Sequence, residues 1–143
     1  VGRHLTALAA AGDDRPDVRP EIAEAWRWLA RRRGAGRIDD LSAHVGLGRR
    51  RLAQLFTAEV GVTPKTVARV MRFDAARHAI AGRVAAGAGP GRLDLAGIAA
   101  DHGYVDHAHL VREFGDLAGL SPTDWIRAEV TNIQASVDLR GPQ

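Results

Sequence analysis

Apolar residues recur along most of the chain at the three- and four-residue spacing of amphipathic α-helices. Glycine and proline interrupt this pattern and divide it into short segments. The pattern predicts an all-α chain of about seven helices, because no segment shows convincing strand alternation. We expect helices at about residues 21–33, 39–45, 49–60, 64–81, 95–102, 107–117 and 122–130.

Residues with strong positional preferences mark several helix ends. Thr63 and Ser121 each precede a proline. The hydroxyl residue is suited to the N-cap, and the proline to the first helical position. Asp94 and Asp106 are suited to cap the helices that follow them. The sequence therefore predicts where four of the helices begin.

The same arrangement of residues occurs twice. When the sequence is shifted so that Leu52 aligns with Leu110, Phe56 aligns with Phe114. The motif Gly-x-Thr/Ser-Pro then follows in both copies, at residues 61–64 and 119–122. Each copy has a short helix, a glycine-containing turn and a second helix, which is the layout of a helix-turn-helix. The second copy has one additional residue in the turn.

The repeat divides the chain into five predicted parts. The first nineteen residues are expected to be the tail of a connection to a domain further upstream, and the last dozen to form a frayed tail. The parts are a linker (1–19), a first helix-turn-helix subdomain (20–63), a linker helix with a Gly-rich connector (64–92), a second helix-turn-helix subdomain (93–130) and a C-terminal tail (131–143).

The second helix of the first copy has a polar outer face. Each residue of an α-helix turns by about 100°, so Leu52 and Phe56 share one buried stripe. The opposite side carries cationic, amide and small side chains, namely Arg50, Arg51, Ala53, Gln54 and Thr57. Arginine can bind guanine through a fork of two hydrogen bonds, and glutamine can bind adenine in the same way.

The second helix of the second copy has a similar outer face. Leu110 and Phe114 share its buried stripe. The opposite side carries His107, Ala108, Val111, Arg112 and Gly115. Valine can contact the methyl group of thymine, and arginine can bind guanine. Two equivalent helices with such faces predict a surface that recognises base pairs.

The composition is compatible with a nucleic-acid partner. The net charge is +3 and the isoelectric point is about 10.5, with Lys65 as the single lysine among 20 basic residues. Arginine is suited to bidentate contacts with phosphate. The absence of cysteine excludes disulfides and thiolate catalysis, and it fits a cytoplasmic protein. No apolar run approaches the roughly 20 residues that span a bilayer, so no membrane partner is expected.

The segment 100–114 concentrates three histidines with acidic residues, which is a candidate metal or catalytic site. However, His107 and His109 are two residues apart and therefore diverge by about 200° on a helix. Histidine pairs that share a metal need to be three or four positions apart in the helix. His102 precedes the turn. We therefore expect no metal, no cofactor, no catalytic residue and no enzymatic activity.

The second copy resembles a known family signature. The stretch IAADHGYVDHAHLVREFGDLAGLSPTDWI resembles the DNA-binding domain of the AraC/XylS family of bacterial transcription regulators, and the resemblance extends over about residues 20–129. The matching positions are Ile98, Ala99, Gly103, Tyr104, Asp106, Leu110, Arg112, Phe114, Gly119, Ser121 and Pro122. The resemblance implies two homeodomain-like subdomains joined by a long helix, with a recognition helix from each in successive major grooves.

The resemblance also implies roles for individual residues. Base contacts are implied for Arg50, Ala53, Gln54, His107, Ala108, Val111 and Arg112. Helix N-termini and basic side chains favour phosphate contacts, which we expect from Arg49, Arg51, Lys65, Thr66, Ser121 and Thr123. Gly48 stands where the family commonly has a serine cap, and Gln54 where it commonly has arginine.

The outer helix faces predict sequence-specific binding of double-stranded DNA. The resemblance implies an activator that controls transcription initiation, with RNA polymerase as a second partner. The resemblance implies that effector binding and dimerisation belong to an upstream domain. The alternative is a helical protein-interaction module without sequence-specific DNA binding. Such a module would present apolar anchors on its outer helix faces.

Overall fold

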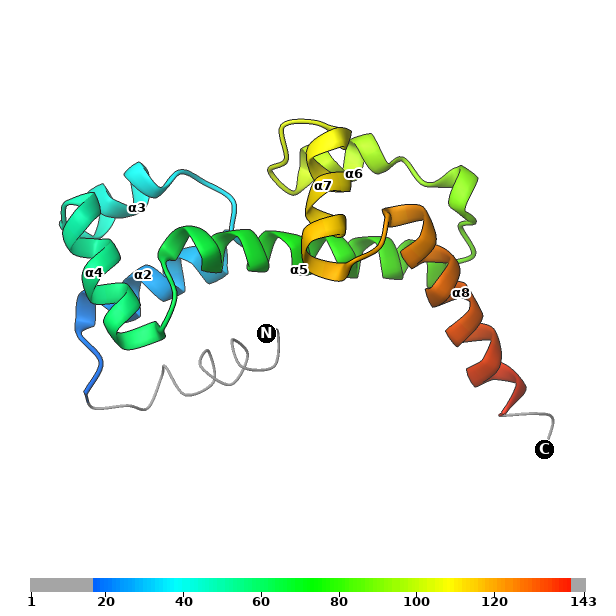
Figure 1. The fold of residues 1–143 in the computed structure, drawn as a ribbon, viewed down its shortest axis with the longest axis horizontal. Coiled ribbons are helices and arrows are strands. Elements are labelled where there is room, and N and C mark those ends of the chain that lie inside the picture. The colour runs from blue at the N-terminus through cyan, green and yellow to red at the C-terminus, as the bar shows by residue number, and fades with distance from the viewer. Residues whose placement is uncertain (1–16, 140–143) are drawn as a thin grey trace. The chain divides into compact units, whose positions relative to one another are not determined.

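The computed structural model describes residues 17–139, and the predicted tails at residues 1–19 and 131–143 lie partly outside this range. Within it the chain forms seven α-helices and one 3-10 helix with no strand, which confirms the all-α prediction (Figure 1). The elements are α2 (Pro20–Arg31), α3 (Ile38–Val45), α4 (Arg49–Val60), α5 (Pro64–Ala85), η1 (Pro90–Arg92), α6 (Leu95–Asp101), α7 (His107–Ala118) and α8 (Pro122–Asp138).

Two helices are longer than the sequence pattern predicted. Helix α5 continues through Gly82 to Ala85. Val84 is buried, and its burial offsets the cost of about 1 kcal/mol for a glycine inside a helix. Helix α8 continues to Asp138, so the prediction of a frayed end from residue 131 was wrong. No described helix is long and apolar enough to cross a membrane.

The extension of α8 has a local cause. No proline or glycine occurs between Pro122 and Gly141, so nothing in the sequence stops the helix. The hydroxyl groups of Thr131 and Ser136 each donate a hydrogen bond to the backbone carbonyl four residues earlier, at 3.0 and 2.8 Å. Residues 131–138 are exposed, and the helix here is held by its own backbone rather than by a core.

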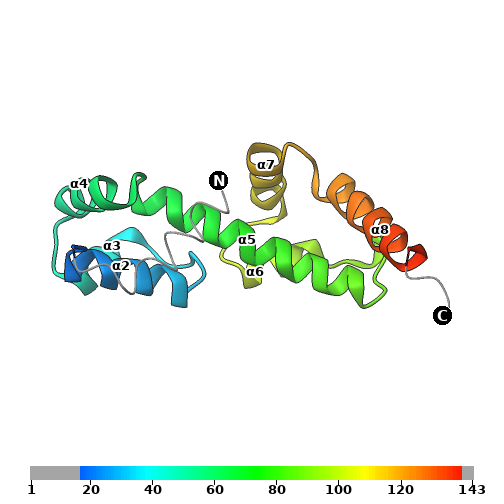
Figure 2. The same cartoon turned by 90° about the horizontal axis from the view of Figure 1, so that it is seen from below.

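The chain divides into two compact units between Arg72 and Phe73, inside α5. Unit 1 comprises the described residues up to Arg72, and its core is formed by α2, α3, α4 and the N-terminal half of α5, which Figure 2 shows beside one another. Its buried residues are Ile22, Ala25, Trp28, Leu29, Leu41, Leu52, Phe56, Val67 and Ala68.

Unit 2 begins at Phe73 and has a core of its own. Aromatic rings organise this core: Phe114 meets Phe73 edge to face at 4.9 Å and Trp125 at 5.8 Å between ring centroids. The buried residues come from the rest of α5 and from α6, α7 and α8, and they are Ala76, Ile80, Val84, Ile98, Ala99, Tyr104, Leu110, Phe114, Trp125 and Ile126.

The sequence repeat corresponds to a structural repeat. Leu52 and Leu110 are each 0% exposed, as are the paired phenylalanines that follow them. The glycines that end α3 and α4 have positive φ angles of 73° and 93°, and their counterparts after α6 and α7 have 79° and 71°. L-residues with a side chain rarely adopt this conformation, which explains why glycine recurs at these turns.

Candidate nucleic-acid interface

Helix α4 presents the face that the helical periodicity predicted. Arg50 and Gln54 are exposed, and Ala53 between them is half-buried. The helix begins after Gly48, whose extended backbone supplies no side-chain cap. The first backbone N–H groups of α4 therefore have no side-chain partner and can donate to an anion.

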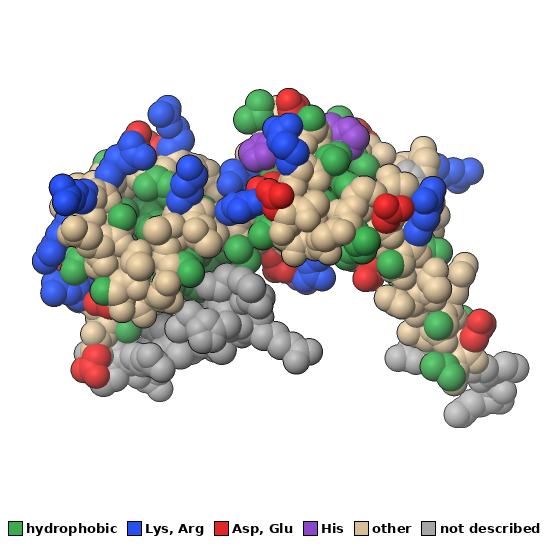
Figure 3. All heavy atoms as spheres, in the orientation of Figure 1, with side chains coloured by type: hydrophobic (Ala, Val, Ile, Leu, Met, Phe, Trp, Pro, Cys, Tyr) green, Lys and Arg blue, Asp and Glu red, His purple; other side chains and the backbone are tan. Residues whose placement is uncertain are grey.

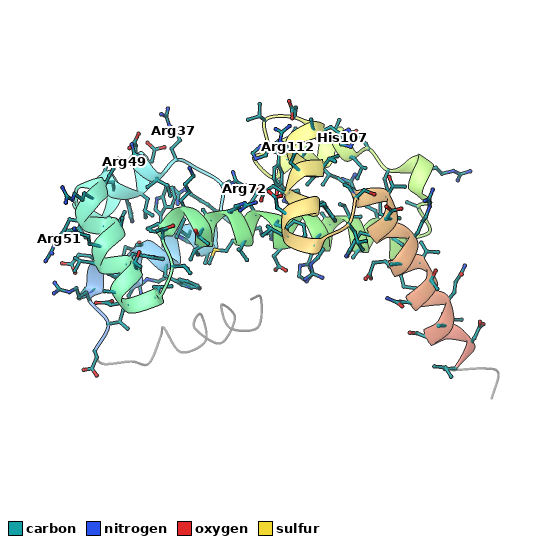
Figure 4. All side chains as sticks on the ribbon, viewed as in Figure 1. Arg37, Arg49, Arg51, Arg72, His107 and Arg112 are labelled. Atoms are coloured by element: carbon teal, nitrogen blue, oxygen red, sulfur yellow. The ribbon has the colours of Figure 1, made fainter. Side chains whose placement is uncertain are left out.

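The arginines around the start of α4 are joined to α3 by an acidic residue. The Nε atom of Arg49 lies 3.1 Å from an Asp39 carboxylate oxygen, and Arg37 lies 3.9 Å from the other oxygen. Figure 4 shows Arg37 and Arg49 close together and Arg51 further along α4. Arg51 is exposed. The contact through Nε leaves the two terminal amino groups of Arg49 available for phosphate.

Arg37 is a candidate phosphate contact that the sequence analysis missed. Its side chain is 81% exposed, and it lies next to Arg49 because both approach Asp39. The residue belongs to the loop between α2 and α3, so it falls on neither predicted recognition helix. The available signal was the basic segment RRRGAGR at residues 31–37.

The start of α5 supplies the other predicted phosphate contacts of unit 1. Thr63 caps the helix by accepting a hydrogen bond of 3.2 Å from the backbone N–H of Thr66, as the sequence predicted. The hydroxyl groups of these two threonines lie 3.0 Å apart. Lys65 and Thr66 are both exposed. The ammonium group of Lys65 is thus accessible, while the hydroxyl of Thr66 is engaged with the cap.

Glu24 on α2 contacts the first helix of the helix-turn-helix of unit 1, which is α3. Glu24 lies 2.9 Å from Nε2 of His44 on α3, and it also contacts Arg31 and Arg27 at 3.0 Å. Hydrogen bonds from His44 first, then from the two arginines, lower the pKa of Glu24 from 4.5 to about 2. The carboxylate therefore stays charged at ordinary pH, where it can accept hydrogen bonds from His44 on α3 and from the two arginines.

Helix α7 exposes all of its predicted base-contacting residues. His107, Ala108 and Arg112 are exposed, and Val111 is 36% exposed. Figure 4 shows His107 and Arg112 along the same helix. Asp106 caps α7 by accepting a hydrogen bond of 2.8 Å from the backbone N–H of His109, which confirms the predicted cap. Unlike α4, this helix therefore begins with an anionic side chain.

The histidines of this segment have different environments. His107 is exposed, whereas His109 is half-buried and meets the ring of Tyr104 edge to face at 5.0 Å. Nδ1 of His109 accepts a hydrogen bond of 3.4 Å from the backbone N–H of Val105, so His109 braces the turn. No group of three His, Asp or Glu side chains within residues 17–139 is placed to hold a metal ion.

The start of α8 is more acidic than the start of α5. The hydroxyl of Ser121 accepts a hydrogen bond of 3.1 Å from the backbone N–H of Asp124 and donates one of 2.9 Å to its carboxylate. Asp124 also pairs with Arg127 at 3.3 Å. The hydroxyl of Ser121 is thus occupied by the cap, while Thr123 is exposed. Pro122 has no N–H, and the N–H groups of Asp124 and Trp125 donate to Ser121, so a phosphate here would bind to the backbone N–H and hydroxyl of Thr123.

The charge is distributed differently over the two units. Figure 3 shows Lys and Arg side chains gathered over α3 and α4 of unit 1. Around α7, histidine, acidic and hydrophobic side chains lie among the basic ones (Figure 3). Unit 1 thus presents the stronger electrostatic attraction for a phosphate backbone, and unit 2 the more varied set of groups for base edges.

Comparison with known proteins gives one match. A family model described as a helix-turn-helix domain matches residues 41–128, from α3 into α8, which is more than half of the chain. No curated protein and no solved structure matches the chain.

Proposed function

We propose a function from one premise: the chain belongs to the AraC/XylS family of helix-turn-helix DNA-binding domains. We infer that both units bind double-stranded DNA sequence-specifically, with α4 and α7 as recognition helices in successive major grooves. The bound protein would control transcription initiation at a promoter, where RNA polymerase would be its second partner. Effector binding and dimerisation would belong to sequence upstream of these units.

One observation carries this proposal. Helices α4 and α7 occupy equivalent places in the repeat, and each exposes guanidinium or amide groups beside small side chains. In this arrangement Arg112 would bind guanine through its fork, Gln54 would bind adenine and Val111 would contact a thymine methyl. The remaining base contacts would come from Arg50, Ala53, His107 and Ala108.

Phosphate contacts would fix the position of each unit on the duplex. In unit 1 they would come from Arg49, Arg51, Lys65 and Thr66, together with Arg37. In unit 2 they would come from the backbone N–H and side chain of Thr123, because the Ser121 hydroxyl is engaged with Asp124. Unit 1 would therefore contribute more of the salt-dependent affinity.

A protein-interaction module is the second candidate. Such a module would anchor itself through apolar side chains on α4 and α7. The exposed side chains of α4 include Arg50, Arg51, Gln54 and Thr57, and none of these is an apolar anchor. The outer face of α4 therefore favours DNA over a protein groove, whereas α7 exposes Val111 and Leu117 to 36% and 37%.

The experiment that tests the proposal compares two kinds of DNA over a range of salt concentrations. The purified chain is titrated into a random-sequence duplex pool and into duplexes enriched by selection, with binding followed by fluorescence anisotropy. We expect the enriched duplexes to bind at least about 1,000-fold more tightly than the pool at physiological salt. Equal affinity for both at every salt concentration would refute sequence-specific binding.

A further inference from the structure

Val105 is an apolar side chain that the fold leaves uncovered. It lies in the turn between α6 and α7, and 88% of its surface is exposed. The only other large hydrophobic residue in the described range with this exposure is Leu139, at its last position. Val105, in contrast, is flanked on both sides by ordered structure.

The backbone around Val105 is held from both sides. Tyr104, directly before it, is buried in the core of unit 2, and its N–H donates a hydrogen bond of 2.9 Å to the carbonyl of Ala99. Asp106, directly after it, caps α7. The N–H of Val105 itself donates to Nδ1 of His109. A β-branched side chain on a fixed backbone has few rotamers, so little entropy is lost when it binds a partner.

The repeat shows that unit 2 does not need Val105 for its fold. Leu47 in unit 1 packs against the core, as Tyr104 does in unit 2. Gly48 and Asp106 both precede the first residue of the second helix. Val105 is thus the additional residue of the second turn, and it has no counterpart in unit 1. Val105 is absent from the core of unit 2, so its exposed side chain is available to meet a partner outside the fold.

We propose that Val105 is a further specificity-determining residue, whose side chain packs against the C5-methyl group of a thymine beside the base pairs contacted by the first turn of α7. This inference rests on the proposed function of α7 as a recognition helix. The residue stands two positions before His107, at the end of the helix that would enter the groove. The thymine methyl is the one apolar group that a base presents in the major groove.

The test removes the thymine methyl group and the Val105 side chain in separate experiments. In the duplex selected by the wild-type protein, each thymine of the block bound by unit 2 is replaced singly by deoxyuridine. Loss of one buried methyl is expected to weaken wild-type binding about threefold to fivefold. With Val105→Ala, deoxyuridine at one position should no longer matter, while Val111→Ala should remove the effect at a different position.

A matched control is Val137→Ala, on the exposed end of α8 in the same unit, where the side chain is 64% exposed. It should leave every deoxyuridine effect unchanged. Thermal unfolding of Val105→Ala should match the wild type, because an exposed side chain contributes little to the core.

The outcomes separate this inference from the proposed function. If every deoxyuridine effect seen with the wild type persisted in Val105→Ala, the inference would be overturned, while binding by α7 would stand. A uniform loss of affinity for all duplexes would also overturn it, because Val105 would then contact the backbone. A wild-type protein without any sequence preference would instead refute the proposed function.

Discussion

Gly34 illustrates how one residue can fix the packing of a unit. It is buried with a φ angle of 76°, and a Cβ atom there would overlap the carbonyl oxygen of Ala68 on α5. Gly46 has a similar φ of 73°, but a Cβ atom there would meet nothing within 4 Å. Both positions have a strained backbone for an L-residue, but only Gly34 also lies against another backbone. Alanine substitutions at the two positions therefore distinguish the two effects.

We expect Gly34→Ala to destabilise unit 1 by about 3 kcal/mol or more, since strain and overpacking add. Gly46→Ala should cost only about 1 kcal/mol, from the left-handed backbone. Urea unfolding followed by fluorescence of Trp26 and Trp28, in a Trp125→Phe background, would measure both. Equal losses in the two variants would contradict the close approach to Ala68.

Glu24 should make the stability of unit 1 sensitive to acid. Its pKa is about 2 in the folded chain and 4.5 ordinarily, so folding favours the charged form. The stabilisation is complete above pH 4.5 and is lost as the pH falls from 4.5 towards 2. We expect Glu24→Gln to have a lower free energy of unfolding than the wild type at neutral pH. Its free energy of unfolding should also fall less steeply in this acid range.

Glu21→Gln is the control for this prediction, because Glu21 lies in the same helix and has no ion pair among the described residues. Urea unfolding of unit 1 at a series of pH values would compare the three proteins. If the Glu24→Gln curve had the same slope as the other two between pH 4.5 and 2, the contacts of Glu24 with His44, Arg31 and Arg27 would not stabilise the fold.

Arg112 and Arg51 should differ in the kind of binding energy they contribute. Arg112→Ala should weaken the selected site by about 1–3 kcal/mol and relax specificity at one base pair, because a base contact is lost. Arg51→Ala should weaken all sequences alike and lower the salt slope by about 1, because a phosphate contact is lost. Anisotropy titrations on selected and single-substituted duplexes would measure both effects. An equal loss of affinity for all duplexes in Arg112→Ala would contradict its role as a base contact.

Among the elements, the equivalent helices α4 and α7 differ in their caps. Asp106 accepts a backbone hydrogen bond at the start of α7, whereas Gly48 offers no side chain to α4. We expect Asp106→Ala to destabilise α7 by about 0.5–2 kcal/mol and Gly48→Ser to stabilise α4 by a few tenths of a kcal/mol. Amide hydrogen exchange resolved by residue would measure both. Unchanged exchange in Asp106→Ala would show that the cap contributes nothing to the helix.

Helix boundaries were predictable where side chains dictate them. Helix α4 has the predicted bounds, since Gly48 precedes it and Gly61 ends it in the left-handed conformation. Helix α8 was predicted too short, because residues 131–138 form no buried stripe and periodicity gives no signal there. Helix α5 was also predicted too short, because burial of Val84 outweighs the glycine before it.

The helix faces of the candidate site were predictable from the sequence, but the contacts between its elements were not. Helical angles alone placed Arg50, Gln54 and Arg112 on the outside, and all three are exposed. The contact of Arg49 with Asp39, and that of Glu24 with His44, depend on how separate helices pack. Such contacts join residues on different elements, and no spacing in a single sequence indicates them.

At the scale of the whole molecule, the proposed function requires one chain to carry two DNA-binding units. Each unit has its own core, and α5 contributes to both. Leu52 and Leu110 have the same place in the repeat, so the duplication extends from sequence to structure. If both units bind bases, the preferred DNA site must have two parts that respond to different residues.

The most direct test is selection from a randomised duplex library, run in parallel with the wild type and two double variants. Arg50→Ala/Gln54→Ala alters α4, and Val111→Ala/Arg112→Ala alters α7. We expect the wild type to select two short blocks about one helical turn apart, roughly 10 base pairs, and each variant to lose one block only. A single block in the wild type, or no enriched sequence at any salt concentration, would contradict the claim of two sequence-specific units.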